Sequence, residues 1–85
     1  MITRDAIIEI IAECMSIQMI DTPIAYETGL EIDSLGFLWM QHLLEERYSF
    51  EVQQPGYEVM CTLNSPKAVH AYLFEVGPHL VEPVE

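Results

Sequence analysis

Residues 29–36 read Gly-Leu-Glu-Ile-Asp-Ser-Leu-Gly, and the rest of the chain is organised around this stretch. A loop ends here and helical periodicity begins. Ser34 is a candidate N-cap, with Asp33 just outside the first turn, because serine is among the residues preferred at helix starts. A helix start also presents unpaired N–H groups and the positive end of the dipole, which favour a phosphate on a serine oxygen. Capping and phosphate attachment are therefore both open to Ser34.

The length and composition indicate one small folded domain spanning residues 1–85. The 85-residue chain is 51% hydrophobic, which is too much for a disordered polypeptide. No apolar run approaches the roughly 18 residues needed to span a bilayer. The N-terminus mixes Arg4 with Asp5 and Glu9, unlike a signal peptide. We expect a cytoplasmic, monomeric protein that does not insert into membranes.

The charge is strongly unbalanced, with 14 acidic residues against three basic ones and a formal net charge of −11. Nucleic acids and anionic membranes are excluded as partners, because both require a basic surface. A field of this sign would speed encounters with basic surfaces on other proteins. Simple solubility would also account for it, so charge alone does not separate the two.

The cysteines and histidines give no sign of a metal site. Cys14 and Cys61 lie far apart without a CxxC pattern, and we expect both to be reduced, buried, apolar side chains. His42, His70 and His79 show no ligand spacing with them, so no metal is expected.

The first helix is expected over about residues 3–18, with Thr3 as N-cap. A long connection follows, over residues 18–33, which is unusual in so small a domain. Its apolar residues suggest that it lies pinned across the core; they are Ile20, Ile24, Tyr26, Leu30 and Ile32.

The second helix is expected over about residues 35–48 and carries two apolar rows. One row is Phe37, Met40, Leu44 and Tyr48, and the other is Leu35, Leu38, Trp39 and His42. Phe37 and Met40 could line a pocket, but core packing is the expected role of both. A helix that is apolar on more than one side is either buried on several sides or meets a partner. The sequence leaves open which applies to the second row.

The C-terminal half contains a shorter and a longer element. Residues 57–62 fit either a short helix or a strand. A last helix is expected over residues 66–76, capped by Asn64 or Ser65, and residues 79–85 read as a frayed acidic tail. The expected fold is all-α: a small bundle of three long helices with a long first loop, in which residues 57–62 add a short fourth helix if they are helical.

Catalysis by this chain alone is not expected, and no catalytic residue is assigned. Ser34 lacks the G-x-S-x-G setting of a hydrolase nucleophile. His42 lies eight positions later on the same helix, about 12 Å along its axis, which is beyond hydrogen-bond reach. There is also no glycine-rich phosphate loop.

The motif Asp33-Ser34-Leu35, opening the second helix of a small acidic protein with a long first loop, resembles the acyl carrier protein family over about residues 3–76. That family includes peptidyl and D-alanyl carriers. The resemblance implies an acyl-carrier-like four-helix bundle and makes Ser34 the attachment site for a 4′-phosphopantetheine arm, which comes from coenzyme A and carries cargo as a thioester. Asp33 would be the neighbouring acidic residue that helps to present serine and metal to the transferase.

Finer features favour a dedicated pathway over general fatty-acid synthesis. Gly36 after the motif, and Asn-Ser-Pro-Lys at residues 64–67, are more similar to discrete D-alanyl and aminoacyl carriers. Glu31 stands where fatty-acid carriers usually have glycine. The usual acidic rim of the second helix is also diluted by apolar residues. Natural-product biosynthesis is therefore the expected setting.

The resemblance implies partners that act on the carrier in trans. They are a phosphopantetheinyl transferase, an acyl- or aminoacyl-loading ligase, and a downstream acyltransferase, synthase or tailoring enzyme. The residues expected to contact them are Leu35, Leu38, Trp39, His42, Glu45 and Glu46. Two alternatives stay open: a D-alanyl-type carrier for cell-wall modification, and an unmodified helical protein-interaction module.

Overall fold

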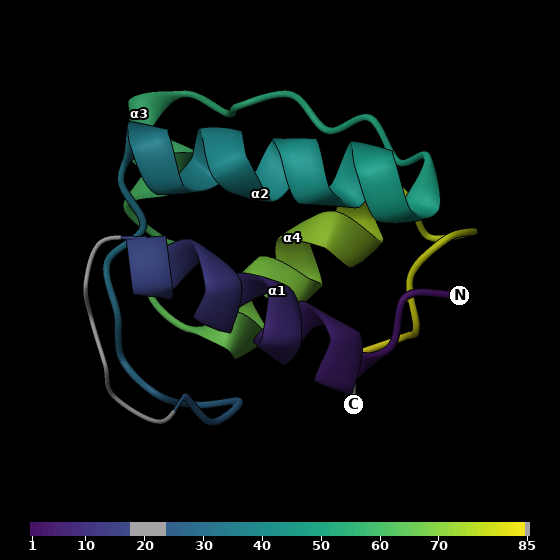
Figure 1. Cartoon of the computed structure of the whole chain (residues 1–85), viewed down its shortest axis with the longest axis horizontal. Coiled ribbons are helices and arrows are strands. Elements are labelled where there is room, and N and C mark those ends of the chain that lie inside the picture. Colours follow the sequence, from purple (N-terminus) through teal and green to yellow (C-terminus); the bar gives the residue numbers. More distant parts are fainter. Residues whose placement is uncertain (18–23, 85) are drawn as a thin grey trace.

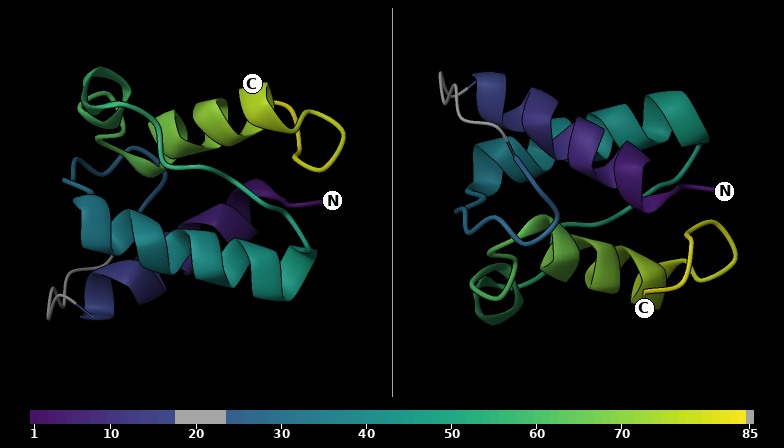
Figure 2. Two further views of the ribbon diagram at one scale, coloured as in Figure 1. Left: turned by 90° about the horizontal axis from the view of Figure 1, so that it is seen from above. Right: turned by 90° about the horizontal axis from the view of Figure 1, so that it is seen from below.

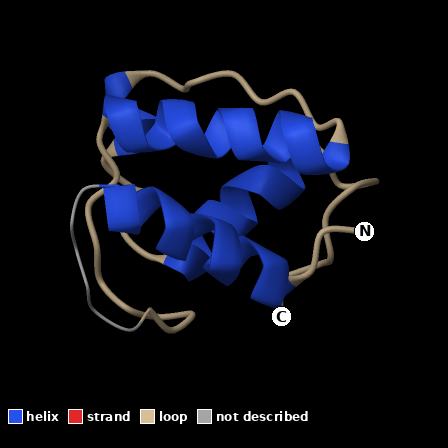
Figure 3. Ribbon diagram, in the orientation of Figure 1, coloured by secondary structure: helices blue, strands red, loops and turns tan. Residues whose placement is uncertain are grey.

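The computed structural model describes residues 1–17 and 24–84. Within these residues the chain forms four helices: α1 (Arg4–Ile17), α2 (Ser34–Tyr48), α3 (Tyr57–Met60) and α4 (Pro66–Val76). Figure 1 shows α1 and α2 packed against each other, with α3 near the start of α2, and Figure 2 shows α4 lying obliquely to one side of that pair, where it contacts α1. The described part of the chain contains no strand (Figure 3). The all-α class and the order of the helices are therefore confirmed.

Two of the helices begin at the residues that the sequence suggests. The Thr3 hydroxyl accepts a hydrogen bond from the backbone N–H of Ala6 at 3.1 Å. Ser65 does the same for Ala68 at 3.1 Å, and Pro66 takes the first helical position, where its missing N–H is not needed. Side-chain caps of this kind define a helix start by satisfying donors that have no partner inside the helix.

The core lies where α1, α2 and α4 meet. Each helix contributes one apolar stripe, and the aromatic rings of Phe37 on α2 and Tyr72 on α4 meet edge to face at 6.5 Å. An ion pair also joins α1 to α2: the Arg47 guanidinium contacts both carboxylate oxygens of Glu13, at 2.6 and 2.8 Å. This hydrogen bonding lowers the pKa of Glu13. The helical core residues are Ile7, Ile10, Ile11, Cys14, Met15, Phe37, Met40, Leu43, Leu44, Val69 and Leu73.

The described part of the first loop, residues 24–33, is held to the start of α4. The backbone N–H of Leu30 donates to the carbonyl of Asn64 at 2.9 Å, and the N–H of Lys67 donates to the carbonyl of Tyr26 at 2.9 Å. Ile24 and Leu30 pack against the core, and Ile32 is part of it. This confirms that the loop lies pinned across the core; Ile20 lies outside the described residues.

The expectation that residues 79–85 form a frayed tail is wrong for residues 80–82. Ile2 and Val81 form a parallel bridge, with backbone hydrogen bonds of 2.7 and 2.9 Å to the two residues that flank Val81. The Glu82 carboxylate accepts a hydrogen bond from the N–H of Arg4 at 2.9 Å, at the start of α1. Both bridge residues are buried, so apolar burial outweighs the acidic character of this segment.

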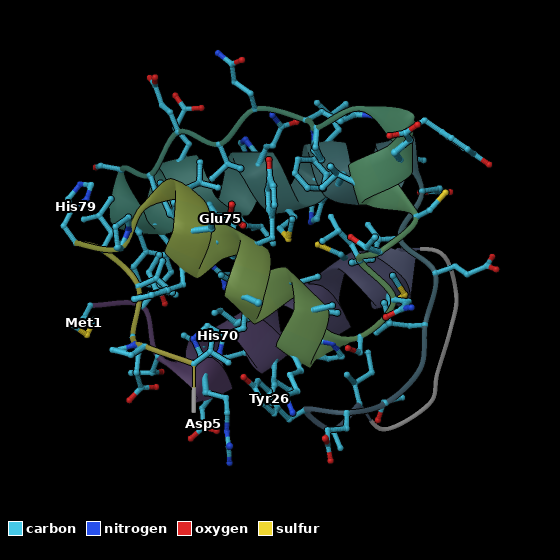
Figure 4. All side chains as sticks on the ribbon, turned by 180° about the vertical axis from the view of Figure 1, so that it is seen from behind. Met1, Asp5, Tyr26, His70, Glu75 and His79 are labelled. Carbon is cyan, nitrogen blue, oxygen red and sulfur yellow. The ribbon has the colours of Figure 1, made fainter. Side chains whose placement is uncertain are left out.

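His70 on α4 connects the first loop to the C-terminal segment. Its side chain is buried, with Nδ1 2.8 Å from the Tyr26 hydroxyl and Nε2 2.6 Å from the carbonyl oxygen of Glu82. Since a carbonyl only accepts, Nε2 carries the proton and Nδ1 accepts from the Tyr26 hydroxyl. Figure 4 shows His70 between α4 and the C-terminal segment, near Tyr26.

Residues 49–56 return from the end of α2 to α3. Ser49 adopts a left-handed conformation (φ 53°) that ends the helix, and Phe50 and Val52 then turn into the core. The Phe50 ring lies so close to Gly77 that a Cβ there would be 2.7 Å from a ring carbon. Glycine is therefore required at the end of α4 by close packing.

Candidate functional site

The start of α2 is capped by Asp33, and the prediction of Ser34 as N-cap is wrong. A carboxylate oxygen of Asp33 accepts a hydrogen bond from the N–H of Gly36 at 2.8 Å, and its backbone is extended (φ −86°, ψ 179°). Ser34 is the first helical residue. Aspartate caps as well as serine does, and here the carboxylate one position earlier reaches the third N–H of the helix.

The Ser34 hydroxyl is consequently exposed and is not used to cap the helix. It accepts a hydrogen bond of 3.2 Å from the side-chain amide of Gln54, in the segment between α2 and α3. The hydroxyl lies in the first turn of a 15-residue helix, so the positive end of the helix dipole faces any group attached to it.

An open cavity of about 530 Å³ adjoins Ser34. Its walls come from the end of the first loop, the first turn of α2, α3 and the residues between α3 and α4. Its walls combine apolar residues, among them Leu30, Met60 and Leu63, with the acidic residues Glu31 and Asp33. No arginine or lysine belongs to the described residues that line it.

The cavity walls include residues that the sequence did not single out as functional. Gln54, Met60 and Leu63 come from loops or from the short α3, where no periodic pattern is long enough to show which side faces Ser34. Phe37 and Met40 do not line the cavity, because both are fully buried in the core as expected.

The two cysteines differ, and the expectation that both are buried is wrong for Cys61. Cys14 is buried in α1, and this burial raises the pKa of its thiol to about 12. Cys61 follows the last residue of α3, is exposed, and lines the cavity beside Ser34. A hydrogen bond to Cys61 raises the pKa of the Tyr57 hydroxyl. Both thiols are free.

One side of α2 carries large apolar side chains that face solvent. Leu35 is 62% exposed, Leu38 59% and Trp39 41%. This second apolar row is therefore not part of the core. Together with the polar residues that follow it on the same side, it forms a surface that we term the outer face of α2: Leu35, Leu38, Trp39, His42, Glu45 and Glu46.

A shallow groove of about 480 Å³ lies on the outer face, between Leu38, Trp39, Gln41, His42 and Glu45. The rings of Trp39 and His42 lie 5.3 Å apart, centre to centre, in a tilted arrangement. His42 Nε2 is 2.9 Å from a carboxylate oxygen of Glu46, one helical turn further on. The groove thus combines aromatic and aliphatic lining residues with one acidic residue, Glu45.

The chain's three basic side chains are all engaged elsewhere. Arg47 pairs with Glu13 on α1, and Lys67 lies 3.5 Å from Glu27 in the first loop. The guanidinium of Arg4 stacks over the Tyr26 ring at 4.6 Å. No lysine or arginine therefore belongs to the outer face of α2, and its carboxylates set the sign of its potential.

His42 and His70 do not form a catalytic pair with Ser34. His42 contacts Glu46, and His70 is buried with both ring nitrogens bonded to other groups. Over residues 1–17 and 24–84 there is no cluster of three or more histidine, cysteine, aspartate or glutamate side chains placed to hold a metal ion. Nor does any helix in these two segments have the length and apolar character required to cross a membrane.

No protein-family model, curated protein or solved structure matches this chain. Two features of the molecule bear on its function: the exposed Ser34 hydroxyl at the start of α2, with the cavity beside it, and the outer face of α2.

Proposed function

We propose that this protein is a discrete acyl or aminoacyl carrier, which bears a 4′-phosphopantetheine arm on Ser34 and acts in a dedicated biosynthetic pathway. The similarity of Asp33-Ser34-Leu35 to the carrier-protein motif supplies the chemistry. The structural observation that supports it is the exposed Ser34 hydroxyl, which Asp33 frees from capping. The chain contributes an attachment point and a surface for partner enzymes, and the catalysis belongs to those partners.

The residues around Ser34 fit a phosphodiester. Its charge would lie at the N-terminus of α2, where the helix dipole and N–H groups favour an anion. The exposed carboxylates of Asp33 and Glu31 oppose it, but water and salt screen this repulsion at the surface. The cavity beside Ser34 offers room and apolar contacts for an attached arm. Once attached, the arm would supply the thiol that holds cargo as a thioester.

The chain's own part in the attachment is to present one oxygen. In the attachment, Ser34 Oγ would form a bond to the phosphorus of coenzyme A nearest the arm, the pyrophosphate bond would break, and adenosine 3′,5′-bisphosphate would leave. The hydroxyl proton passes to a base of the transferase or to water. Asp33 fixes the first turn through the N–H of Gly36, and the amide of Gln54 bonds to the serine oxygen. The first contact holds the turn that carries Ser34, and the second holds the hydroxyl itself.

The test is the intact mass of the protein after incubation with coenzyme A, magnesium and a broad-specificity phosphopantetheinyl transferase. The parent should gain one arm and Ser34→Ala none. Ser49→Gly is the matched control, because it removes another exposed serine at a position whose φ of 53° glycine adopts freely. A folded parent that gains no arm with several transferases, or a Ser34→Ala variant that gains one, would overturn the proposal.

A second candidate, an unmodified helical interaction module, is favoured by the exposed apolar side chains of α2. In that case Ser34→Ala would leave every partner interaction and every cellular function intact. A carrier would retain binding but lose cargo transfer in the same variant. Among carriers, a D-alanyl type for cell-wall modification is recognised by the acid that its loading ligase activates, so loading with D-alanine against other amino and aryl acids separates these cases.

A further inference from the structure

The segment between α2 and α3 brings the side chain of Gln54 to Ser34. The side-chain amide of Gln54 donates a hydrogen bond of 3.2 Å to Ser34 Oγ, and both residues line the cavity at the start of α2. The two residues lie 20 positions apart in the sequence. Their contact therefore depends on the path of residues 49–56 and not on the local geometry of the helix.

The backbone of this segment is fixed on both sides of Gln54. Val52 is buried in the core, and its carbonyl accepts a hydrogen bond from the side-chain amide of Gln41 on α2. Pro55 follows Gln54, and the residue before a proline is restricted to extended conformations. The amide thus reaches Ser34 from a backbone that is already held in place, so forming the contact orders only one side chain.

The direction of this hydrogen bond decides where the serine proton can go. An amide N–H only donates, so Ser34 Oγ is the acceptor and its own proton points away from the Gln54 nitrogen. The proton is then open to a base outside the chain. As a base removes it, negative charge develops on Oγ, and a donor already aimed at this oxygen stabilises that charge.

The charged residues around the cavity cannot take this role. Among the described residues that line it, the charged ones are Glu31 and Asp33, and an ionised carboxylate has no proton to donate. A carboxylate in place of Gln54 would also oppose an entering phosphate, whereas a neutral amide does not.

We propose that Gln54 is a positioning residue for the attachment reaction: its amide holds Ser34 Oγ in place, leaves the serine proton available to the base, and stabilises the oxygen as the proton departs. The reaction in this inference rests on the proposed function. The contact itself belongs to the unmodified protein and can be tested without any attachment.

The first measurement follows the side-chain amide of Gln54 by nuclear magnetic resonance in the unmodified, isotope-labelled protein. Ser34→Ala removes the acceptor, so the Gln54 amide resonances should shift. Those of Gln53, the neighbouring exposed glutamine, should stay in place, because Gln53 contributes its backbone carbonyl to a 3.3 Å hydrogen bond from the Tyr72 hydroxyl and its side chain does not line the cavity. Gln54 resonances that ignore Ser34→Ala would overturn the inference.

The second measurement is the rate of attachment in a single turnover, with a broad-specificity phosphopantetheinyl transferase in excess and with coenzyme A and magnesium saturating. Gln54→Met keeps the length of the side chain but cannot donate, so the maximal rate should fall about 3–10-fold, as expected for the loss of one neutral hydrogen bond. The transferase concentration that gives half of this rate should change less than about twofold, because the contact acts in the reaction and not in binding.

Matched variants separate the role of the amide from a general effect of substitution. Gln54→Glu should be slower than Gln54→Met, because its carboxylate accepts the serine proton and repels the entering phosphate. Gln54→Lys supplies a donor again and should recover the parent rate. Gln53→Met and Gln53→Glu make the same changes one residue away and should leave the rate unchanged. Because Gln54 is exposed, none of its variants should alter the urea midpoint of unfolding.

A Gln54→Met rate equal to that of the parent, an equal loss in Gln53→Met, or a Gln54→Lys rate as low as that of Gln54→Met would each overturn the inference. If the parent gains the arm and Gln54→Met gains it equally fast, this inference alone fails and the carrier proposal stands. A folded parent that gains no arm rejects the carrier proposal and, with it, any role of Gln54 in attachment.

Discussion

The two sides of α2 are similarly apolar in sequence but have opposite environments. Phe37, Met40 and Leu44 are essentially inaccessible to solvent, whereas Leu35 and Leu38 are about 60% exposed. The inner side packs against α1 and against Tyr72 of α4. No element of the described chain covers the outer side. The hydrophobicity of a helix thus shows that it meets something, and only the fold shows which side the domain itself uses.

Phe37→Ala should produce the largest loss of stability. Its ring is wholly buried and meets Tyr72 of α4, so truncation leaves a cavity and should cost about 3–5 kcal/mol of unfolding free energy. Urea denaturation followed by circular dichroism measures this loss. A loss below about 1 kcal/mol would mean that the two sides of α2 do not differ as described.

The cysteines extend the comparison of buried and exposed positions. At pH 8 iodoacetamide should alkylate Cys61 in the native protein and reach Cys14 only in denaturant, giving one adduct and then two by mass. Burial raises the pKa of Cys14 from 9.0 to about 12, so its thiolate population at this pH is about a thousandfold lower than when unfolded. Two adducts in the native state would contradict the burial of Cys14.

The raised pKa of Cys14 also predicts how the stability of the protein changes with pH. The folded state keeps the Cys14 thiol protonated, so its contribution is fully present below the unfolded pKa near 9 and is lost as pH rises toward 12. Cys14→Ala should reduce the part of the alkaline destabilisation that this thiol causes. Urea midpoints measured at pH 8 and 10.5 in both proteins provide the check.

Asp33→Ala and Ser34→Ala sharpen the comparison at the first turn of α2. Loss of the Asp33 cap should cost about 1 kcal/mol, whereas Ser34→Ala should change stability by less than about 0.5 kcal/mol. Thermal unfolding of both variants measures the order. The opposite order would show that Ser34 is the cap. Its hydroxyl would then be bonded to the helix and would not be available for attachment of an arm.

Leu38→Ala should have the smallest effect on stability, within about 0.5 kcal/mol of the parent, because its side chain already faces water. Its urea midpoint is compared with that of Phe37→Ala, which makes an alanine truncation one residue away. A loss comparable to that of Phe37→Ala would show that the outer face is packed inside the domain and is not a free surface.

The helices were predictable because their signals are local. Thr3, Ser65 and Pro66 mark helix starts within a few residues of the groups that they satisfy. The choice between Asp33 and Ser34 as cap was not, because both side chains suit the position and the outcome depends on which one reaches Gly36.

Features that depend on distant parts of the chain were missed. The packing of the C-terminal segment depends on Ile2, at the opposite end of the sequence, so its acidic composition gave the wrong expectation. The sequence motif was enough to single out Ser34 as the candidate attachment residue. Its surroundings, such as Gln54 and Leu63, come from loops whose path no periodicity specifies.

The bridge between Ile2 and Val81 brings the beginning and end of the described chain together, and Figures 1 and 2 show both far from the first turn of α2. A linker attached at either end would thus leave from the pole opposite Ser34. If the domain were anchored to a surface or fused to another protein, Ser34 and the outer face of α2 would point away from the attachment. Anchored in this way, it would offer its attachment point to several enzymes in turn without being released.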